Sequence, residues 1–289
     1  MTRKTAYSSI LWLACAFGIQ PLSAEDSHGY LALGDSLAFG FSPLVVPVDL
    51  KKYHGYPEIV ADQIDGKLAN ASCFGETSQH FLNLAGEDLG CSGWRAAYPL
   101  FVSYSGTQMD YAVQYLKSHP TTGLVTIDIG INDLGVLLRD CLGNIACALA
   151  GFPNVLTAYQ DHLTTIYTRI RVEAGYKGPL VAVTAYAVNY TDPVQTPAIA
   201  TLDGVLSAVT AAFGGKVADA FAAFGAAAAT HSGDVCPTGL LVKLPNNTCD
   251  THPSAKGQAL IADLILELLA KGDEQGGGDQ GNNDNQGDH

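Results

Sequence analysis

The chain has 289 residues, of which 47% are hydrophobic, and its 15 basic and 28 acidic side chains give a net charge of −13. This length and apolar content allow one domain with a substantial core. The acidic balance argues against a nucleic-acid partner, because phosphate contacts need clustered Lys and Arg. It also disfavours electrostatic docking on anionic membranes.

Residues 1–24 have the pattern of a secretory signal peptide. Arg3 and Lys4 form a basic start, the apolar stretch 10–19 is too short to span a bilayer, and Leu-Ser-Ala ends the segment as a cleavage site. The rival pattern is a lipoprotein signal ending at Cys15, but a Trp stands where a small aliphatic residue is usual. Losing Arg3 and Lys4 changes the net charge from −13 to −15. We therefore expect a secreted protein, extracellular or periplasmic, that is monomeric and has no stable membrane anchor.

The cysteines support export. Seven occur, and the six that follow the leader form three consecutive close pairs. An even number behind a signal peptide indicates disulfides, although six cysteines permit fifteen pairings. Joining neighbours predicts the bridges Cys73–Cys91, Cys141–Cys147 and Cys236–Cys249. The spacings do not match paired Cys-x-x-Cys or Cys/His motifs, so we expect no metal site.

Short apolar strands then alternate with amphipathic helices along the chain. Strands are expected at 29–33, 67–73, 124–129, 179–185 and 216–220. Helices are expected at 56–64, from about residue 77, and at 107–119, 152–174, 198–213 and 254–269, with Ser105 and Ser254 as caps. The alternation predicts an α/β fold in which helices cover both faces of a parallel sheet. This domain spans 25–270, and the Gly-, Asp- and Asn-rich segment 271–289 is expected to be disordered.

Functional sites of parallel sheets form at the carboxyl ends of the strands. Ser36 follows the first expected strand directly, where the strand holds it rigidly and the next turn exposes its hydroxyl group and backbone N–H. Gly75 follows the second expected strand and Asn132 follows the third. The three residues are therefore expected on one rim of the sheet.

A serine needs a base to act as a nucleophile. Of eight histidines, His252 stands out, because it lies two residues after Asp250 in a turn that Cys249 pins just before the last helix. Donors for an oxyanion hole are the N–H of Ser36, the N–H of Gly75, which no side chain obstructs, and the Asn132 amide. The alternatives are a structural turn at His252, a simple turn at Gly75 and a helix cap at Asn132.

Together these segments resemble the four sequence blocks of the SGNH, or GDSL, hydrolases: Gly34-Asp35-Ser36-Leu37, Gly75, Gly130-Ile131-Asn132-Asp133 and His252-Pro253. The resemblance extends from about residue 30 to the last helix. It implies a flavodoxin-like three-layer α/β/α sandwich and ester hydrolysis through an acyl-enzyme, with no metal or organic cofactor. By similarity, Ser36 is the nucleophile and His252 the base, and Ser36, Gly75 and Asn132 form the oxyanion hole.

One position departs from the family pattern. Members commonly place the catalytic acid three residues before the histidine, and here that residue is Cys249. Either Asp250 reaches the imidazole by a different turn, or a backbone carbonyl replaces the carboxylate. Asp35 and Asp133 are expected to be structural, accepting hydrogen bonds from backbone N–H groups.

The sequence does not determine which ester is the substrate. The apolar segment 37–47 and the aromatic segment 84–104 either line an acyl pocket or pack on the core. An apolar pocket favours fatty-acyl esters, as in an esterase or lipase, whereas aromatic walls suit a carbohydrate O-deacetylase. Acyl transfer to an alcohol other than water is a further alternative, and an inactive binding protein on a hydrolase scaffold is the alternative from another class.

Overall fold

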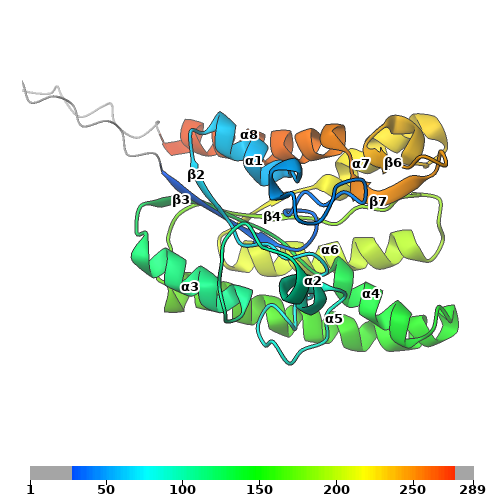
Figure 1. Cartoon of the computed structure of the whole chain (residues 1–289), viewed down its shortest axis with the longest axis horizontal. Coiled ribbons are helices and arrows are strands. Elements are labelled where there is room, and N and C mark those ends of the chain that lie inside the picture. Colours follow the sequence, from blue (N-terminus) through cyan, green and yellow to red (C-terminus); the bar gives the residue numbers. More distant parts are fainter. Residues whose placement is uncertain (1–27, 277–289) are drawn as a thin grey trace, which may run out of the picture.

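A five-stranded parallel sheet forms the centre of the protein (Figure 1). The structure is a computed structural model that describes residues 28–276, so the expected leader and residues 277–289 of the expected tail lie outside it. The spatial order of the strands is β2-β1-β3-β4-β5, and all neighbours are parallel. The strands are β1 Gly29–Gly34, β2 Lys67–Asn70, β3 Thr122–Asp128, β4 Leu180–Val183 and β5 Lys216–Ala218.

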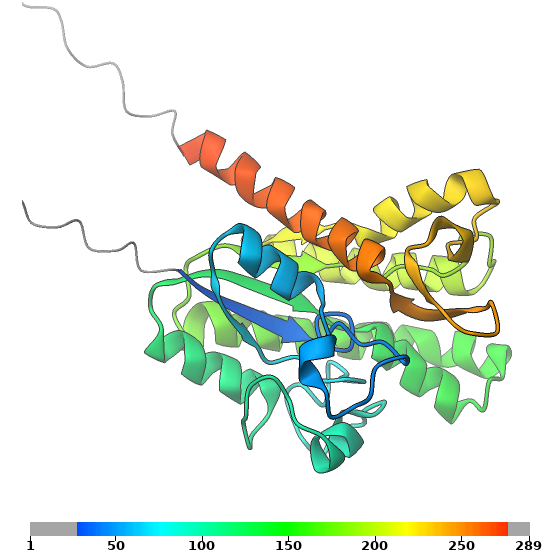
Figure 2. The same cartoon turned by 45° about the horizontal axis from the view of Figure 1, so that its top comes forward.

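Helices cover both faces of this sheet, as Figures 1 and 2 show. Helices α3, α5 and α6 pack on one face, and α1, α7 and α8 pack on the other. The helices are α1 Tyr56–Gln63, α2 Cys91–Ala97, α3 Gln108–Ser118, α4 Ile131–Asp140, α5 Ile145–Thr168, α6 Gln195–Ala212, α7 Ala220–Ala228 and α8 Ala255–Gly276. The predicted three-layer α/β/α sandwich with a parallel sheet is confirmed.

Strand β1 shows why both faces are covered. Leu31 and Leu33 point into the cluster formed with α3, α5 and α6, whereas Tyr30 and Ala32 point into the cluster formed with α1, α7 and α8. All four side chains are fully buried. Successive residues of a strand alternate between its faces, so an unbroken apolar run fits only a strand buried on both sides.

The position of β1 determines where a site can form. The chain moves from β1 to β2 on one side and later to β3 on the other, so the connections diverge at the carboxyl end of β1. Such a reversal opens a crevice at the ends of the strands. In the register of the sheet, Gly34 at the end of β1 lies beside Asp128 at the end of β3.

A small antiparallel hairpin lies outside the main sheet. Its strands are β6 Leu241–Lys243 and β7 Cys249–Pro253, and β7 leads directly into α8. His252 therefore lies in a strand, where the sequence predicted a turn. Ser254 accepts a hydrogen bond from the N–H of Gly257 at 3.3 Å, as expected for a cap.

Some predicted elements differ from the structure. No helix begins near residue 77, because Thr77 and Ser78 are buried in a loop and bonded to distant groups, Glu87 and Asp133. Thr107, not Ser105, caps α3 by accepting from the N–H of Asp110 at 3.0 Å.

The ends of two helices also differ from the prediction. Helix α5 begins earlier than expected, at Ile145, and carries Pro153 inside it. Helix α8 continues to Gly276, past the expected start of the tail, since extending a formed helix costs little compared with starting one.

Three disulfides join the pairs named from the sequence. Their Cα atoms are 5.5 Å apart in Cys73–Cys91, 5.6 Å in Cys141–Cys147 and 5.7 Å in Cys236–Cys249. Within residues 28–276, no helix is both long enough and apolar enough to cross a membrane.

Candidate active site

Ser36 lies in the turn that follows β1, at the rim of the sheet. Gly34 ends the strand with φ +142°, and a Cβ atom there would lie 2.4 Å from the carbonyl oxygen of Asp128, so only glycine fits. Asp35 then accepts a hydrogen bond from the N–H of Leu37 at 2.9 Å. This side-chain turn fixes the backbone on both sides of Ser36.

His252 lies against Ser36, although 216 positions separate them in the chain. Its Nε2 atom is 3.0 Å from Ser36 Oγ. Its Nδ1 atom is 2.5 Å from Oδ1 of Asp250, which also accepts from the backbone N–H of His252 at 2.9 Å. Residues two apart in a strand face the same side, so β7 points both groups toward Ser36. A carboxylate, not a backbone carbonyl, is therefore the partner of Nδ1 in the structure.

Aromatic rings hold the imidazole in place. The ring centroid of Phe41 lies 4.7 Å from that of His252, and the centroid of Phe74 lies 6.2 Å from it. Tyr186 donates its hydroxyl group to the carbonyl of Thr251 at 2.7 Å and so fixes β7. These contacts restrict the rotation of the His252 side chain.

Two of the expected oxyanion donors are available. Among residues 28–276, the backbone N–H groups of Ser36 and Gly75 have no hydrogen-bond acceptor. Gly75 has φ +74°, and a Cβ atom there would come within 2.6 Å of the backbone of Leu89. A glycine is therefore required both by the backbone conformation and by the close approach of another loop.

The third expected donor, the Asn132 amide, is already occupied. Its Nδ2 donates to Oδ2 of Asp35 at 3.0 Å and to the carbonyl oxygen of Glu76 at 2.9 Å. Asn132 does not cap a helix either, because the N-cap of α4 is Gly130 and has no side-chain bond. The amide therefore ties the turn that carries Ser36 and the loop that carries Gly75 to the start of α4.

Two buried carboxyl groups lie beneath Ser36. Asp35 donates its N–H to Oδ2 of Asp128 at 3.1 Å, and Tyr56 donates its hydroxyl to Oδ1 of Asp128 at 2.7 Å. Burial and the neighbouring Asp128 charge hold the pKa of Asp35 well above its usual range, and burial raises the pKa of Asp128. The pair therefore retains a proton more readily than two exposed carboxylates. For Asp128, the only signal in the sequence is an aspartate in the stretch 124–129, which is otherwise apolar apart from Thr126.

Gln108, at the start of α3, clamps the end of β1. It accepts from the N–H of Gly34 at 2.6 Å and donates to the Gly34 carbonyl at 3.0 Å. The same amide donates to Oε2 of Glu76 at 3.1 Å, and Glu76 is paired with His80 in the interior. The strand end and the Gly75 loop are thus held together by side chains that the sequence did not single out.

Asp133 has the structural role expected for it. It accepts from the N–H of Ser78 at 3.0 Å and from the Ser78 hydroxyl at 2.5 Å. The same hydroxyl lies 2.8 Å from Nδ1 of His162, in α5. Ser78 is fully buried, so this second serine–histidine–aspartate contact joins a loop to α4 and α5 and is closed to solvent.

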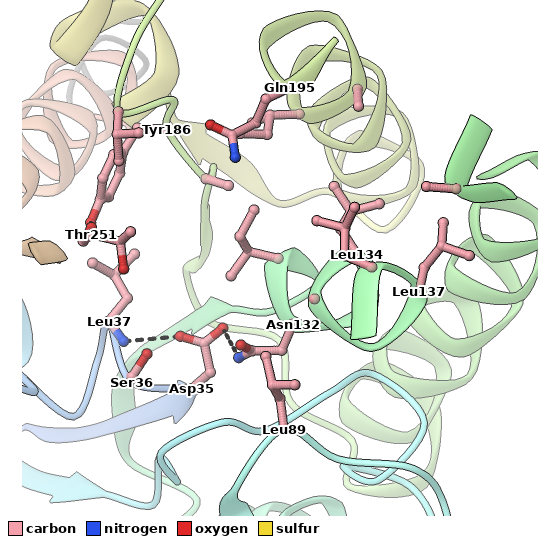
Figure 3. Close-up of a pocket in the computed structure, with 18 of the residues that line it drawn as sticks. Asp35, Ser36, Leu37, Leu89, Asn132, Leu134, Leu137, Tyr186, Gln195 and Thr251 are labelled. Carbon is pink, nitrogen blue, oxygen red and sulfur yellow. Dashed lines mark hydrogen bonds between the residues drawn. The ribbon is translucent and has the colours of Figure 1, made fainter. Parts of the chain in front are cut away.

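An apolar groove of about 490 Å³ opens beside Ser36. Figure 3 shows Leu134 and then Leu137, on α4, lying progressively farther from Ser36. Most of its lining comes from α4, from the first turns of α5 and α6 and from the segment after β4: Ile131, Leu134, Gly135, Leu137, Leu138, Ile145, Ala148, Leu149, Phe152, Ala185, Val188, Val194, Ala198 and Ile199.

The two apolar segments that the sequence offered as pocket walls contribute little to this groove. From them, only Leu37 and Leu89 line it. Phe39, Trp94 and Phe101 pack on one another in a separate aromatic cluster. The aromatic residues Phe39, Trp94 and Phe101 therefore pack on the core, and the groove walls come from helices in which no sequence pattern indicates a site.

One close group of metal-ligand side chains occurs within the described range, formed by Cys73, Glu76 and Cys91. Both cysteines are joined in a disulfide, so neither offers a thiolate. This group is unsuited to holding a metal ion.

This chain belongs to the GDSL-like lipase/acylhydrolase family, whose model matches residues 32–260. Membership supports an ester hydrolase and confirms the family resemblance noted in the sequence. A search of curated proteins found no match.

Several solved structures share the fold. Phospholipase A1 from Streptomyces albidoflavus NA297 has a TM-score of 0.55 and 21% identity over 83% of this chain and 99% of that one. An extracellular lipase from Streptomyces rimosus has a TM-score of 0.53 and 19% identity, over 83% of this chain and 99% of that one. An acetyl xylan esterase from Geobacillus stearothermophilus has a TM-score of 0.51 and 18% identity, over 84% of this chain and 94% of that one. At these identities the comparisons support the fold alone.

Proposed function

We propose that the protein is a secreted serine esterase or lipase that hydrolyses carboxylic esters through an acyl-enzyme on Ser36. One observation carries this proposal. Ser36 Oγ, the His252 imidazole and the Asp250 carboxylate form a continuous hydrogen-bonded series, with contacts of 3.0 Å and 2.5 Å, beside an apolar groove. This geometry is what activation of a serine by a base and an orienting acid requires.

The reaction follows from these contacts. Nε2 of His252 takes the Ser36 proton as Oγ attacks the ester carbonyl, and Asp250 holds the ring and stabilises the imidazolium that forms. The developing oxyanion accepts hydrogen bonds from the N–H groups of Ser36 and Gly75. His252 then protonates the leaving alcohol. Water attacks the acyl-enzyme in the same way and releases the acid.

Asn132 joins the oxyanion hole by sharing or giving up one of its present bonds. Its N–H groups are directed at Asp35 and at the carbonyl of Glu76. A carboxyl group that keeps its proton is a weaker acceptor than a carboxylate. The raised pKa of Asp35 therefore lowers the cost of turning the amide toward the oxyanion.

The groove supports an apolar acyl group as the acid part of the substrate. Apart from Asp35, Ser36, Asn132 and His252 at the site itself, its polar lining side chains are few: Asp192, Gln195, Thr251 and the hydroxyl of Tyr186. A sugar needs many convergent polar partners, whereas an acyl chain needs apolar walls. This composition favours an esterase or lipase over a carbohydrate O-deacetylase. Secretion is supported by the three disulfides, which persist in oxidising compartments.

The test compares the wild type with Ser36→Ala and Asp250→Asn on a soluble short-chain nitrophenyl ester. Ser36→Ala is expected to lower kcat by roughly 10³-fold or more, and Asp250→Asn by roughly 10²- to 10⁴-fold, because the ring loses its orienting charge. A fluorophosphonate should label Ser36 in the folded wild type. Full hydrolysis by Ser36→Ala would exclude the mechanism, and failure to label would favour an inactive binding protein.

A further inference from the structure

Large apolar side chains are exposed at the tip where α4 meets α5. We call Leu138, Leu142, Ile145 and Leu149 the tip patch; their exposed fractions are 38%, 94%, 44% and 54%. The disulfide between Cys141 and Cys147 closes the loop that carries Leu142. Figures 1 and 2 show this α4–α5 connection at one end of the molecule.

Leu142 is the most unusual member of the tip patch. Its backbone has φ +52°, in the left-handed region that glycine and asparagine adopt more readily than leucine. Its side chain, 94% exposed, buries almost nothing against the rest of the chain. Within the folded protein, the backbone conformation of Leu142 is therefore strained and its side chain gains almost no burial free energy. Any stabilising contact of this side chain must be made with a partner outside the chain.

The tip patch is continuous with the groove. Leu138, Ile145 and Leu149 are partly exposed on the surface and also line the cavity that reaches Ser36. Because α4 rises about 1.5 Å per residue, Leu138 lies about 9 Å along the helix from Asn132. An acyl chain that extended from Ser36 along the groove and out of it in this direction would pass directly onto the tip patch.

Charge restricts the kind of partner. Arg139, beside the patch, is paired with Glu87 at 2.5 Å and with Asp140 at 2.9 Å. The whole chain carries a net charge of −13, so an anionic surface would repel it. An electrically neutral surface with apolar material beneath its headgroups fits both observations.

We propose that the tip patch docks on the surface of aggregated zwitterionic lipid, so that acyl chains pass from the lipid phase into the groove. This inference rests on the proposed function, because it assigns the groove to the acyl chain of an ester. Leu142 inserts at the tip, and the disulfide keeps the loop that carries it compact. The lipid covers apolar surface that the protein itself leaves in water.

The docking test uses Leu142→Asn in the Ser36→Ala background, where phosphatidylcholine vesicles are not consumed. Asparagine tolerates the left-handed backbone, so the fold is retained. Loss of one inserted leucine should lower the partition coefficient for these vesicles about tenfold. The matched control is Val172→Asn. Val172 is 73% exposed and does not line the groove, so this change should leave binding unaltered.

The outcomes separate docking from catalysis. With Ser36 intact, Leu142→Asn should hydrolyse a soluble short-chain ester as the wild type does, and vesicle lipid about tenfold more slowly. Equal vesicle binding by the Leu142→Asn variant, an equal loss in Val172→Asn, or tighter binding to phosphatidylglycerol would overturn the proposal. So would a dimer that Leu142→Asn abolishes, since a second copy would then cover the patch. Absence of soluble-ester hydrolysis would instead refute the proposed function, while vesicle binding would still report on docking.

Discussion

Several carboxyl groups are buried in this protein without a cation beside them. Asp35 and Asp128 are satisfied by backbone N–H groups, the Asn132 amide and a tyrosine hydroxyl. Neutral donors compensate only part of the cost of burying a charge, so the pKa values of both acids rise. Around Ser36, the hydrogen bonds of these two buried acids maintain the geometry of the site, and the free-energy cost of burying the acids is accepted in exchange.

Asp203, in α6, is also buried, and fewer hydrogen bonds compensate for its burial. Its Oδ1 accepts from the N–H of Ala185 at 2.9 Å, but Oδ2 has no partner among the described residues. Burial, with a smaller contribution from the charge of Asp219, raises the pKa of Asp203 to about 8. In the unfolded chain the pKa is about 3.9. Between these values the folded state binds more protons than the unfolded state, so stability falls as pH rises from about 4 to about 8.

Replacing this acid should therefore stabilise the protein in a pH-dependent way. Asp203→Asn keeps the acceptor for Ala185 and removes the buried ionisation. We expect the free energy of unfolding in urea to rise by a few kcal/mol at pH 9 and to change little at pH 4. Asp161→Asn, an exposed change on α5, serves as the control and should alter neither value. A gain for Asp203→Asn that is equal at both pH values would contradict the assignment.

Among the helices and strands, hydrophobic periodicity predicted the strands of the sheet but did not predict which helices line the groove. Strand β3 and helix α3 are visible locally, because burial on two faces or on one stripe leaves its own spacing in the sequence. No helix forms from about residue 77, where one was predicted, since the bonds of Thr77 and Ser78 to distant groups override local preference. Helix α4 was missed, although Ile131, Leu134 and Leu138 repeat at helical spacing. No local pattern indicates that this apolar stripe faces a groove, because that depends on where α5 and α6 begin.

Helix α4 should control the length of acyl chain that the groove accepts. Leu137 lies beyond Leu134 as seen from Ser36, so a larger side chain there blocks only the distal part (Figure 3). We expect Leu137→Trp to lower kcat/KM about tenfold for long-chain esters and to leave acetyl and butyryl esters unchanged. The measurement is a nitrophenyl ester series of increasing chain length. Leu137→Met, which conserves volume, is the control, and an equal loss at every length would argue against this direction of binding.

At the scale of the whole molecule, the site joins the two ends of the fold. Ser36 follows the first strand, and His252 arrives with the last hairpin just before α8. Strand order alone placed Ser36, Gly75 and Asn132 on one rim, because the carboxyl ends of parallel strands share an edge. The contact of Asp250 with His252 was not predictable in the same way. It depends on residues 249–253 being extended and paired with β6, and no local signal indicated a strand there.

The Cys236–Cys249 disulfide should therefore matter to catalysis as well as to stability. It closes the chain around β6 and anchors β7, which carries both Asp250 and His252. In the chain-entropy description, this disulfide stabilises the fold by about 3 kcal/mol and Cys141–Cys147, which closes a shorter loop, by about 2 kcal/mol.

We expect Cys236→Ala/Cys249→Ala to lower Tm. At a temperature where the variant stays folded, we also expect it to lower kcat at least about tenfold, since small displacements of a catalytic base are costly. Cys141→Ala/Cys147→Ala should lower Tm but keep kcat on a soluble short-chain ester, because neither cysteine lies in β7 or lines the groove. If both double variants kept full kcat, the remaining contacts of β7 would suffice to position His252, and the disulfide would serve stability alone.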